Sequence, residues 1–308
     1  MSIFYQLSEF LSLPVEEIRK IYHQAPNSYK IYKIPKRNGG ERLICHPSSH
    51  LKSVQYAIRC MYLSDLKVHD VAVAYRKGIA SPLRNNALAH SEYNYSVRVD
   101  FKDFFPSISS RDLVGCLKSN RVELTEEEFS ILSTFIFPVS RLTKGLPIGA
   151  PVSPIISNAV MYDFDCDTLS IANEISENSV VTRYADDIVF SAGSYDDTRV
   201  FVKKISELVE KTSSPKLTIN KKKTLYMVPG SRRCVTGVVI KGKNDISIGR
   251  ERKRYIRSLV HLYVSNKLEE KLIRHLTGYL AFVLDVEPLF YKTLVMKYGP
   301  KVNNILTY

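Results

Sequence analysis

Three aspartates in this sequence have the residue type and the setting to bind divalent cations. Asp186 and Asp187 are adjacent and separate two short apolar stretches, and Asp100 ends a stretch of alternating residues. Gathered in one place, their like charges would raise one another's pKa and oppose folding unless cations bound between them. Mg²⁺ prefers carboxylate oxygens, and two such ions can activate a hydroxyl and stabilise a leaving phosphate oxygen. These residues predict phosphoryl transfer, although an Asp-Asp pair taken alone is more typical of a turn.

The elements that must position these aspartates are predicted to be strands backed by helices. Residues 95–100 alternate as a strand does, and residues 180–184 and 188–191 predict strands on either side of the acidic pair. Residues 153–167 have helical periodicity, with Ser153 as the expected N-cap. This order of elements predicts an α+β layer in which an antiparallel sheet is backed by helices.

Further regular elements are expected on both sides of this layer. They are a basic β-hairpin at residues 29–35 and 42–45 with an Asn-Gly-Gly turn at residues 38–40, strands at residues 225–228 and 234–240, and helices from Arg250 onward.

The composition favours a nucleic-acid partner. The 308 residues include 44 Lys and Arg against 31 Asp and Glu, a formal net charge of +13, and the commonest partner for such an excess is a polyanion. The five cysteines are scattered without a C-x-x-C pair, which indicates reduced thiols rather than a zinc site. We find no signal-peptide pattern and no apolar stretch of the ~18 residues that a membrane span needs. We therefore expect a soluble, cytoplasmic protein with no membrane partner.

Three motifs occur in an order and at a spacing that resemble those of reverse transcriptases. Residues 184–187 (Y-A-D-D) look like the Y-x-D-D box of that family, and residues 97–105 (V-R-V-D-F-K-D-F-F) resemble its first aspartate motif. Residues 146–154 (L-P-I-G-A-P-V-S-P) resemble its L-P-Q-G-x-x-x-S-P box. The resemblance implies a right-hand polymerase fold with an antiparallel palm sheet backed by helices and a helical thumb. It implies fingers at residues 1–92 and 120–158, a palm at residues 93–119 and 159–241, and a thumb at residues 242–308.

The resemblance also implies which residues act in catalysis. Asp100, Asp186 and Asp187 would be the catalytic residues and would bind two Mg²⁺ ions, for which Mn²⁺ could substitute. The backbone carbonyl of Phe101 would also contact metal, whereas Asp103 would lie outside the metal triad.

Four further positions match residues with which the family binds deoxynucleoside triphosphates. Phe105 matches the bulky sugar gate that leaves no room for a ribose 2′-hydroxyl, and Arg42 and Lys223 match basic positions near the nucleotide. Gly149 allows close approach of the backbone. From the residues alone, Phe105 could also be a core aromatic, and Arg42 and Lys223 could be solvated charges. The family usually has Gln where this chain has Ile148, and Ile has no amide to hydrogen-bond near the nucleotide.

Two more motifs resemble those of bacterial retron reverse transcriptases. Residues 86–90 (N-A-L-A-H) look like their N-A-x-x-H signature, and residues 235–237 match their V-T-G motif. Each is weak alone, since a four-residue spacing also fits a helix face or a cap. A basic helix start near residue 250 adds physical support, because it suits phosphate contacts along a duplex. The residues predicted to bind RNA are Asn86, His90, Val235, Thr236, Gly237, Arg250 and Arg254.

The retron resemblance implies a particular reaction and particular partners. The enzyme would bind its cognate structured noncoding RNA (msr-msd), start DNA synthesis from a guanosine 2′-hydroxyl, and yield branched multicopy single-stranded DNA (msDNA). This RNA–DNA product would restrain or guide an effector protein encoded nearby, in an antiphage defence system.

Other functions were compatible with parts of this pattern. The alternatives are a group II intron-like or diversity-generating reverse transcriptase, a catalytically silent RNA-binding scaffold with a palm fold, and a palm-fold nucleotide cyclase. The two paired motifs and the expected lack of a C-terminal extension favour the retron type over the first. The intact aspartate triad argues against the scaffold, and a cyclase would have no use for residues 146–154.

Overall fold

The computed structural model describes residues 2–36, 39–138 and 144–307. Within these residues no helix combines the length and the apolar composition needed to cross a membrane. The α-helices are α1 (Ile3–Leu11), α2 (Val15–Gln24), α3 (Ser49–Ile58), α4 (Pro82–Ala89), α5 (Phe104–Ser107), α6 (Ser110–Ser119), α7 (Glu126–Ile136), α8 (Ser153–Val160), α9 (Tyr162–Ile175), α10 (Tyr195–Lys211), α11 (Arg250–Val264), α12 (Glu270–Val286) and α13 (Pro288–Tyr298). The strands are β1 (Tyr29–Pro35), β2 (Glu41–Pro47), β3 (Tyr95–Asp100), β4 (Ser179–Tyr184), β5 (Asp187–Ala192), β6 (Leu225–Met227), β7 (Arg233–Val235), β8 (Val238–Gly242) and β9 (Asp245–Ser247).

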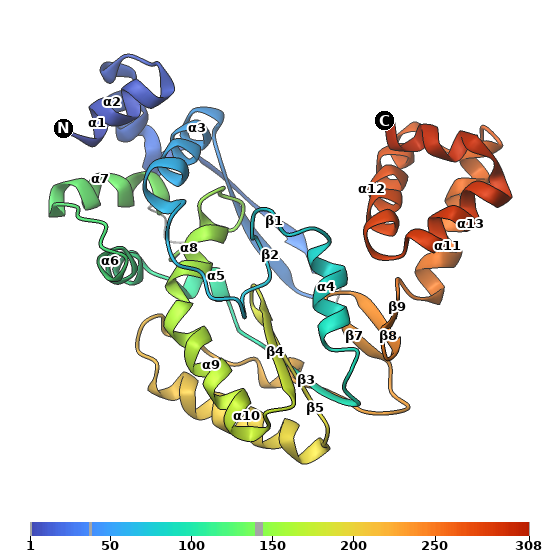
Figure 1. The fold of residues 1–308 in the computed structure, drawn as a ribbon. Helices are drawn as coiled ribbons and strands as arrows, with labels where there is room; N and C mark the ends of the chain where they lie inside the picture. The colour runs from blue at the N-terminus through green and yellow to red at the C-terminus, as the bar shows by residue number, and fades with distance from the viewer. Residues whose placement is uncertain (1, 37–38, 139–143, 308) are drawn as a thin grey trace.

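The aspartate-bearing strands belong to a four-stranded antiparallel sheet with the order β4-β5-β3-β6. The alternation of residues along β3 directs Val97 and Val99 into the core, where both are fully buried. Helices α9 and α10 contact each other and the strands of this sheet, as Figure 1 shows. The predicted α+β layer, an antiparallel sheet backed by helices, is therefore confirmed.

The β1–β2 hairpin is joined by its backbone to the middle of the chain. Its two strands pair antiparallel over their full length, and the predicted turn between them includes Asn38, which lies outside the described residues. The amide of Cys45 in β2 donates to the carbonyl of Ile148 at 2.8 Å. This bond fixes the hairpin against the segment that connects α7 to α8.

Residues 233–307 lie apart from helices α9 and α10 (Figure 1). Their buried apolar residues form a second hydrophobic core, to which Val189 of β5 and Met227 of β6 also contribute. Strands β7, β8 and β9 form a small sheet, and buried residues such as Val235 and Leu280 join it to α11, α12 and α13. Helix α4 enters the same core through Ala87, and Arg233 of β7 donates to the carbonyl of His90, the residue after α4, at 2.8 Å. The palm–thumb boundary after residue 241 stays a prediction. That position falls inside β8. Because β7, β8 and β9 share the second core with α11, α12 and α13, a boundary before β7 is favoured.

The strand expected at residues 234–240 is instead the β7–β8 hairpin. Thr236 and Gly237 turn the chain with φ angles of 47° and 83°, and Val235 pairs with Val238 across the turn. Two consecutive residues with positive φ are what a tight two-residue hairpin requires. Apolar residues typical of strands lie on both sides of the turn, which is why the sequence predicted one strand.

The helix expected at residues 153–167 is interrupted at Met161, between α8 and α9. Its predicted N-cap is also wrong, because Ser153 is the first residue inside α8 and Val152 precedes it. The hydroxyl of Ser153 donates to the carbonyl of Pro147 at 2.7 Å, so this side chain stabilises the preceding loop.

Candidate active site

The antiparallel register brings the three aspartates to one end of the sheet. Asp100, the last residue of β3, pairs directly with Asp187, the first residue of β5. The amide of Phe101 donates to the carbonyl of Asp186 at 3.0 Å, so the turn between β4 and β5 lies against the end of β3. The structure thus brings together the residues predicted for catalysis, while their catalytic role and the metal contact of the Phe101 carbonyl stay predictions.

Basic side chains partly neutralise this concentration of carboxylates. The Nζ of Lys223 donates to both carboxylate oxygens of Asp100, at 2.9 and 2.8 Å, and the Nε of Arg98 lies 4.0 Å from a carboxylate oxygen of Asp187. Burial raises the pKa of Asp186, and the charge of Asp100 raises it further. Burial and the neighbouring Asp186 raise the pKa of Asp187 to about 6. Perturbed carboxylates of this kind are typical of functional sites.

The donor set fits hard divalent cations, because carboxylate oxygens are the ligands that Mg²⁺ prefers and a cation would relieve the mutual repulsion. The side chains are nevertheless not gathered around an ion position: among the described residues, no group of three His, Cys, Asp or Glu side chains could hold a metal as it stands. Lys223 contacts the Asp100 oxygens that a cation would take. Metal binding at Asp100 would therefore require this ammonium group to move.

A buried arginine supports the turn that carries Asp186. Ala185 has a φ of 56°, a left-handed conformation that is uncommon for residues with a Cβ. The guanidinium of Arg183 donates to the carbonyl of Ala185 at 3.1 Å and to both carboxylate oxygens of Asp165 at 2.7 and 2.6 Å. Arg183 and Asp165 are both fully buried, and a buried charge is stable only when paired in this way. Helix α9, through Asp165, thus fixes the turn in place.

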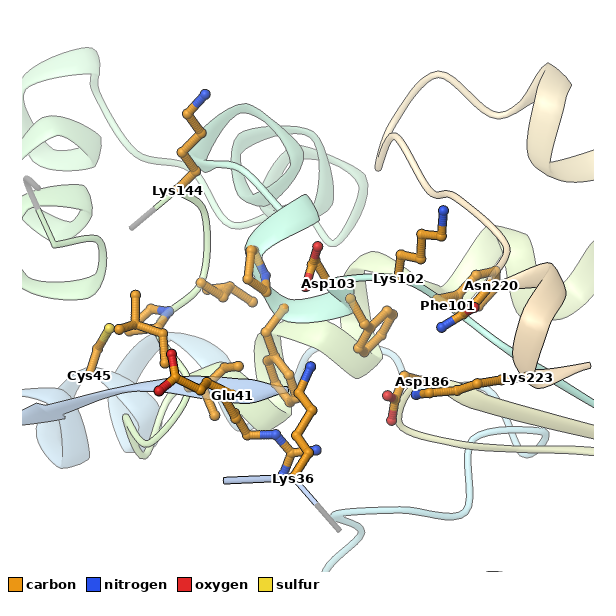
Figure 2. A pocket seen from close by; sticks show the side chains of 18 of the residues that line it. Lys36, Glu41, Cys45, Phe101, Lys102, Asp103, Lys144, Asp186, Asn220 and Lys223 are labelled. Atoms are coloured by element: carbon orange, nitrogen blue, oxygen red, sulfur yellow. The ribbon is translucent and has the colours of Figure 1, made fainter. Parts of the chain in front are cut away.

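A cavity of about 530 Å³ opens beside Asp186. Figure 2 shows Asp186 and Lys223 at one end of it and Cys45 and Lys144 toward the other. Its walls come from the β1–β2 hairpin, from residues 101–106 after β3, from residues 146–148 and from Asp186. Residues of all three reverse-transcriptase-like motifs therefore line one space. Cationic side chains around a carboxylate suit a phosphate-bearing ligand bound with metal. The basic lining residues are Lys36, Arg42, Lys102, Lys144 and Lys223.

Close backbone packing explains the two glycines of the segment that faces this cavity. Gly145 has a φ of 65°, and a Cβ there would lie 2.3 Å from the carbonyl oxygen of Pro106. Gly149 has a φ of 114°, and a Cβ there would approach a side chain of β2 to 3.3 Å. The amide of Leu146 donates to the carbonyl of Phe105 at 3.1 Å. The segment is thus held between α5 and β2, and nucleotide binding at Gly149 stays a prediction.

Phe105 differs from the other aromatic residues of its run. Phe101 and Phe104 are 2% and 3% exposed and stack on each other within the core. Phe105 is only partly buried and lines both the 530 Å³ cavity and a smaller one beside it. This placement fits the predicted sugar gate better than a purely structural role. Arg42 is exposed on β2 and lines the larger cavity, where a triphosphate contact stays a prediction.

Several residues that line the cavity were missed from the sequence. Lys36 and Lys144 belong to none of the motifs, and Lys102 lies within the first aspartate motif without a predicted role; only the fold brings the three together. Tyr75 also lines the cavity. The one local signal for it is the Y-R-K-G run at residues 75–78, an aromatic and two basic residues before a glycine, which is typical of an exposed loop.

Asn86 and His90 of the N-A-L-A-H motif are buried at the end of α4, against strands β4 and β5. The ring nitrogens of His90 lie 2.8 Å from the hydroxyls of Ser191 and Thr182, and Thr182 donates to Asn86 at 2.7 Å. Burial lowers the pKa of His90 to about 3, and the charge of Arg233 lowers it further. His90 and Asn86 are 0% and 2% exposed, so their side chains have no surface for RNA. The prediction that they contact RNA directly does not agree with this structure.

The three V-T-G residues lie in different surroundings. Val235 is fully buried, which leaves its side chain no direct contact with RNA. Thr236 lines a cavity of about 470 Å³, and its buried Oγ1 has no hydrogen-bond partner among the described residues. The carbonyl of Gly237 accepts from Arg252 at 3.1 Å. The other residues that line the 470 Å³ cavity are Arg252, Arg274, His275, Gly278, Tyr279 and Phe282. RNA binding by Thr236 and Gly237 stays a prediction.

Helix α11 begins with basic residues whose surroundings differ. Three of them contact other parts of the protein: Arg252 lies over the ring of Phe282, Arg257 over that of Phe290, and Lys253 pairs with Glu287. Arg250 and Arg254 are exposed, and in the described part of the chain no ion pair involves either. These two remain available to a polyanion, as predicted for RNA binding.

The chain is similar to known reverse transcriptases in sequence and in structure. The family model described as reverse transcriptase (RNA-dependent DNA polymerase) matches residues 34–271. The chain is 35% identical to the retron Ec83 reverse transcriptase of Escherichia coli over 88% of this chain and 87% of that protein. It is 32% identical to the E. coli retron Ec73 reverse transcriptase over 97% and 96%. Among solved structures, apo telomerase from Candida tropicalis matches with a TM-score of 0.50 at 14% identity, over 90% of this chain and 60% of that one.

The fold and the site together define a polymerase of the right-hand class, as the sequence predicted. The chain belongs to the reverse transcriptase family and, within it, to the retron reverse transcriptases. It is therefore an RNA-directed DNA polymerase.

Proposed function

We propose that this enzyme copies its cognate structured noncoding RNA, primed by a guanosine 2′-hydroxyl, into branched multicopy single-stranded DNA. The observation that carries the chemistry is the meeting of Asp100, Asp186 and Asp187 at the end of a cavity lined by basic side chains. Similarity to retron enzymes over most of both chains supports the retron form of the reaction.

In the proposed reaction the attacking hydroxyl and the α-phosphate meet beside the three carboxylates. Two Mg²⁺ ions held by these carboxylates and the Phe101 carbonyl would lower the pKa of the hydroxyl and neutralise the leaving pyrophosphate, and Mn²⁺ accepts the same ligands. Arg42 would orient the triphosphate from β2. Lys223, once displaced from Asp100, would be free to reach the same phosphates. Phe105 would exclude a ribose 2′-hydroxyl from the sugar position.

The C-terminal part supplies a surface on which the structured RNA would be held. Arg250 and Arg254 are exposed on α11, and charges of this kind contact phosphates without selecting sequence. The nearby 470 Å³ cavity adds the side chains of Arg274 and His275 and the ring of Tyr279, a combination suited to unpaired nucleotides. This arrangement supports binding of a folded RNA with both duplex and single-stranded parts.

The proposed setting is the bacterial cytoplasm, where the RNA–DNA product would restrain or guide an effector protein as part of antiphage defence. This proposal rests on the retron resemblance, and the DNA flanking the gene tests it. We expect an inverted-repeat RNA locus and an effector gene next to the coding sequence. Their absence would contradict the partner assignment without affecting the polymerase assignment.

The central test is the product formed in cells that carry the gene with its flanking DNA. The wild-type protein should copurify with RNA covalently joined to DNA. Asp186→Asn should abolish this product, because the amide cannot replace an anionic metal ligand. The matched control is Asp196→Asn on α10, which changes an exposed aspartate remote from the cavity and should leave the product unchanged. Synthesis that continued in the Asp186→Asn variant would contradict the metal-dependent mechanism, and an unbranched product would contradict the priming step.

A further inference from the structure

Tyr75 has a backbone conformation that its residue type does not favour. Its φ is 61°, in the left-handed region where a side chain with a Cβ is strained. Nearly half of the residue (46%) is nevertheless exposed, so burial of the ring does not explain the strain. Strained residues persist where their surroundings fix them, and they cluster at ligand sites.

The chain before Tyr75 is fixed to the end of β4, next to the turn that carries Asp186. Val73 donates to the carbonyl of Arg183 at 2.9 Å, and the amide of Arg183 donates to the carbonyl of Val71 at 2.7 Å. The buried side chain of Asn158 donates to the carbonyl of Ala74 at 2.8 Å. Because Arg183 also supports the turn that carries Asp186, Tyr75 is held in a constant position relative to that aspartate.

The ring of Tyr75 stands at the junction of two cavities. Its centroid lies 6.4 Å from that of Phe105 and 6.3 Å from that of Tyr184. One cavity is the proposed nucleotide site, and the other, of about 350 Å³, lies on the far side of Phe105 and Ile148.

The lining of the second cavity suits a nucleobase and its backbone. It combines the basic Lys52, the exposed ring of Tyr56 and the apolar surface of Pro151 and Pro154. An aromatic ring stacks on any base, and a basic residue follows the phosphates, which is how single strands are held without sequence preference. A template nucleotide in this cavity would pair with the incoming nucleotide across the position of Tyr75.

We propose that Tyr75 is a specificity-determining residue, whose ring contacts the nascent base pair between template and incoming nucleotide and favours correctly shaped pairs. The inference rests on the proposed polymerase function and adds a residue to it. Phe105 would contact the sugar of the incoming nucleotide, and Tyr75 would contact the base pair. The strained backbone fixes the position of the ring relative to the turn that carries Asp186. A base pair of the wrong shape would therefore clash with the ring or lose contact with it.

Single-nucleotide extension of a DNA primer on an RNA template tests this role. Tyr75→Ala should raise the KM for the correct nucleotide by about 10-fold, with a smaller change in kcat, and should lower discrimination against mismatched nucleotides by a similar factor, as loss of a base–ring contact predicts. Tyr75→Phe keeps the ring and should retain wild-type KM and discrimination. The matched control is Tyr195→Ala, which removes a tyrosine of similar exposure (41%) at the start of α10.

A second measurement does not depend on turnover. A template with 2-aminopurine at the pairing position should fluoresce more brightly in complex with Tyr75→Ala than with wild type, because ring contact quenches the base. If the wild-type enzyme extends the primer but Tyr75→Ala keeps wild-type KM and discrimination, or if fluorescence is unchanged, this inference is overturned alone. If wild type does not extend the primer at all, the proposed function fails as well.

Discussion

Phe105 lies where α5 meets the 530 Å³ cavity, and its neighbours in sequence show how local pattern and placement differ. Three aromatic residues within five positions predict a core segment equally well, and two of them, Phe101 and Phe104, are indeed buried. Only the backbone path of α5 turns the third ring toward the cavity. The chemistry of a single residue therefore depends on a short helix that the sequence pattern did not predict.

Replacement of Phe105 by Ala should admit ribonucleotides. The smaller side chain leaves space for a 2′-hydroxyl, so we expect the preference for deoxynucleotides, as a ratio of kcat/KM values, to fall by about 10-fold or more, since steric selection of one small group supplies that range. Paired dNTP and rNTP extension kinetics measure it. Phe105→Tyr keeps the ring and should preserve the preference. Unchanged discrimination in Phe105→Ala would show that the ring serves only packing.

At the scale of elements, strands were easier to predict than the connections between them. Alternation predicted β3, and short apolar stretches on either side of the acidic pair predicted β4 and β5. Strand β5 is apolar throughout because it buries both faces, with Ile188 and Phe190 in one core and Val189 in the other. The β7–β8 turn was missed because Thr236 is not a residue that favours positive φ, and tertiary packing imposes it there. The burial of Asn86 and His90 was missed for a related reason. Their partners Thr182 and Ser191 lie far along the chain, and no local pattern reports them.

The link between α4 and the sheet should make stability depend on pH. The pKa of His90 falls from its ordinary value of 6.5 to about 3 in the folded protein, so between these values the unfolded chain binds a proton that the folded chain does not. This contribution is complete above pH 6.5 and is lost as pH falls toward 3, by up to about 1.4 kcal/mol per pH unit. Urea unfolding across this range should therefore show a shallower loss of stability in His90→Gln than in wild type.

Other groups also titrate in this range, so the comparison needs a control. His50→Gln removes an exposed histidine from the start of α3 and should leave the slope of stability against pH as it is in wild type. If stability falls equally steeply with decreasing pH in wild type and in His90→Gln, the view that His90 is buried in the neutral form is contradicted.

At the scale of the whole molecule, part of the excess positive charge is concentrated in two places. Part of it lines the nucleotide cavity, and part lies on α11, where internal contacts engage three basic residues and leave Arg250 and Arg254 exposed. The net charge of +13 predicted a polyanion from the sequence. It could not indicate which basic residues are available, because that depends on where Phe282, Phe290 and Glu287 lie in the fold.

Removal of the two exposed charges should weaken RNA binding in a salt-dependent way. For Arg250→Gln/Arg254→Gln we expect lower affinity for the RNA that copurifies with the enzyme, and a plot of log K against log salt shallower by about 2, close to one unit per lost phosphate contact. Filter binding at several salt concentrations measures the slope. The charge-matched control is Lys20→Gln/Arg199→Gln, which changes exposed residues of α2 and α10. An unchanged slope in the first variant would remove these arginines from the RNA surface.

Arg233 bonds the small C-terminal sheet to the end of α4, and His90, at that end, bonds to the two strands that flank the catalytic turn. Hydrogen bonds through Arg233 and His90 therefore connect β7 to β4 and β5. A load applied at the V-T-G turn, next to Arg233, would reach β4 and β5, the two strands joined by the turn that contains Asp186. The surface predicted to bind RNA and the alignment of the three aspartates are in this sense parts of one linkage, in which a fixed position at one end resists displacement at the other.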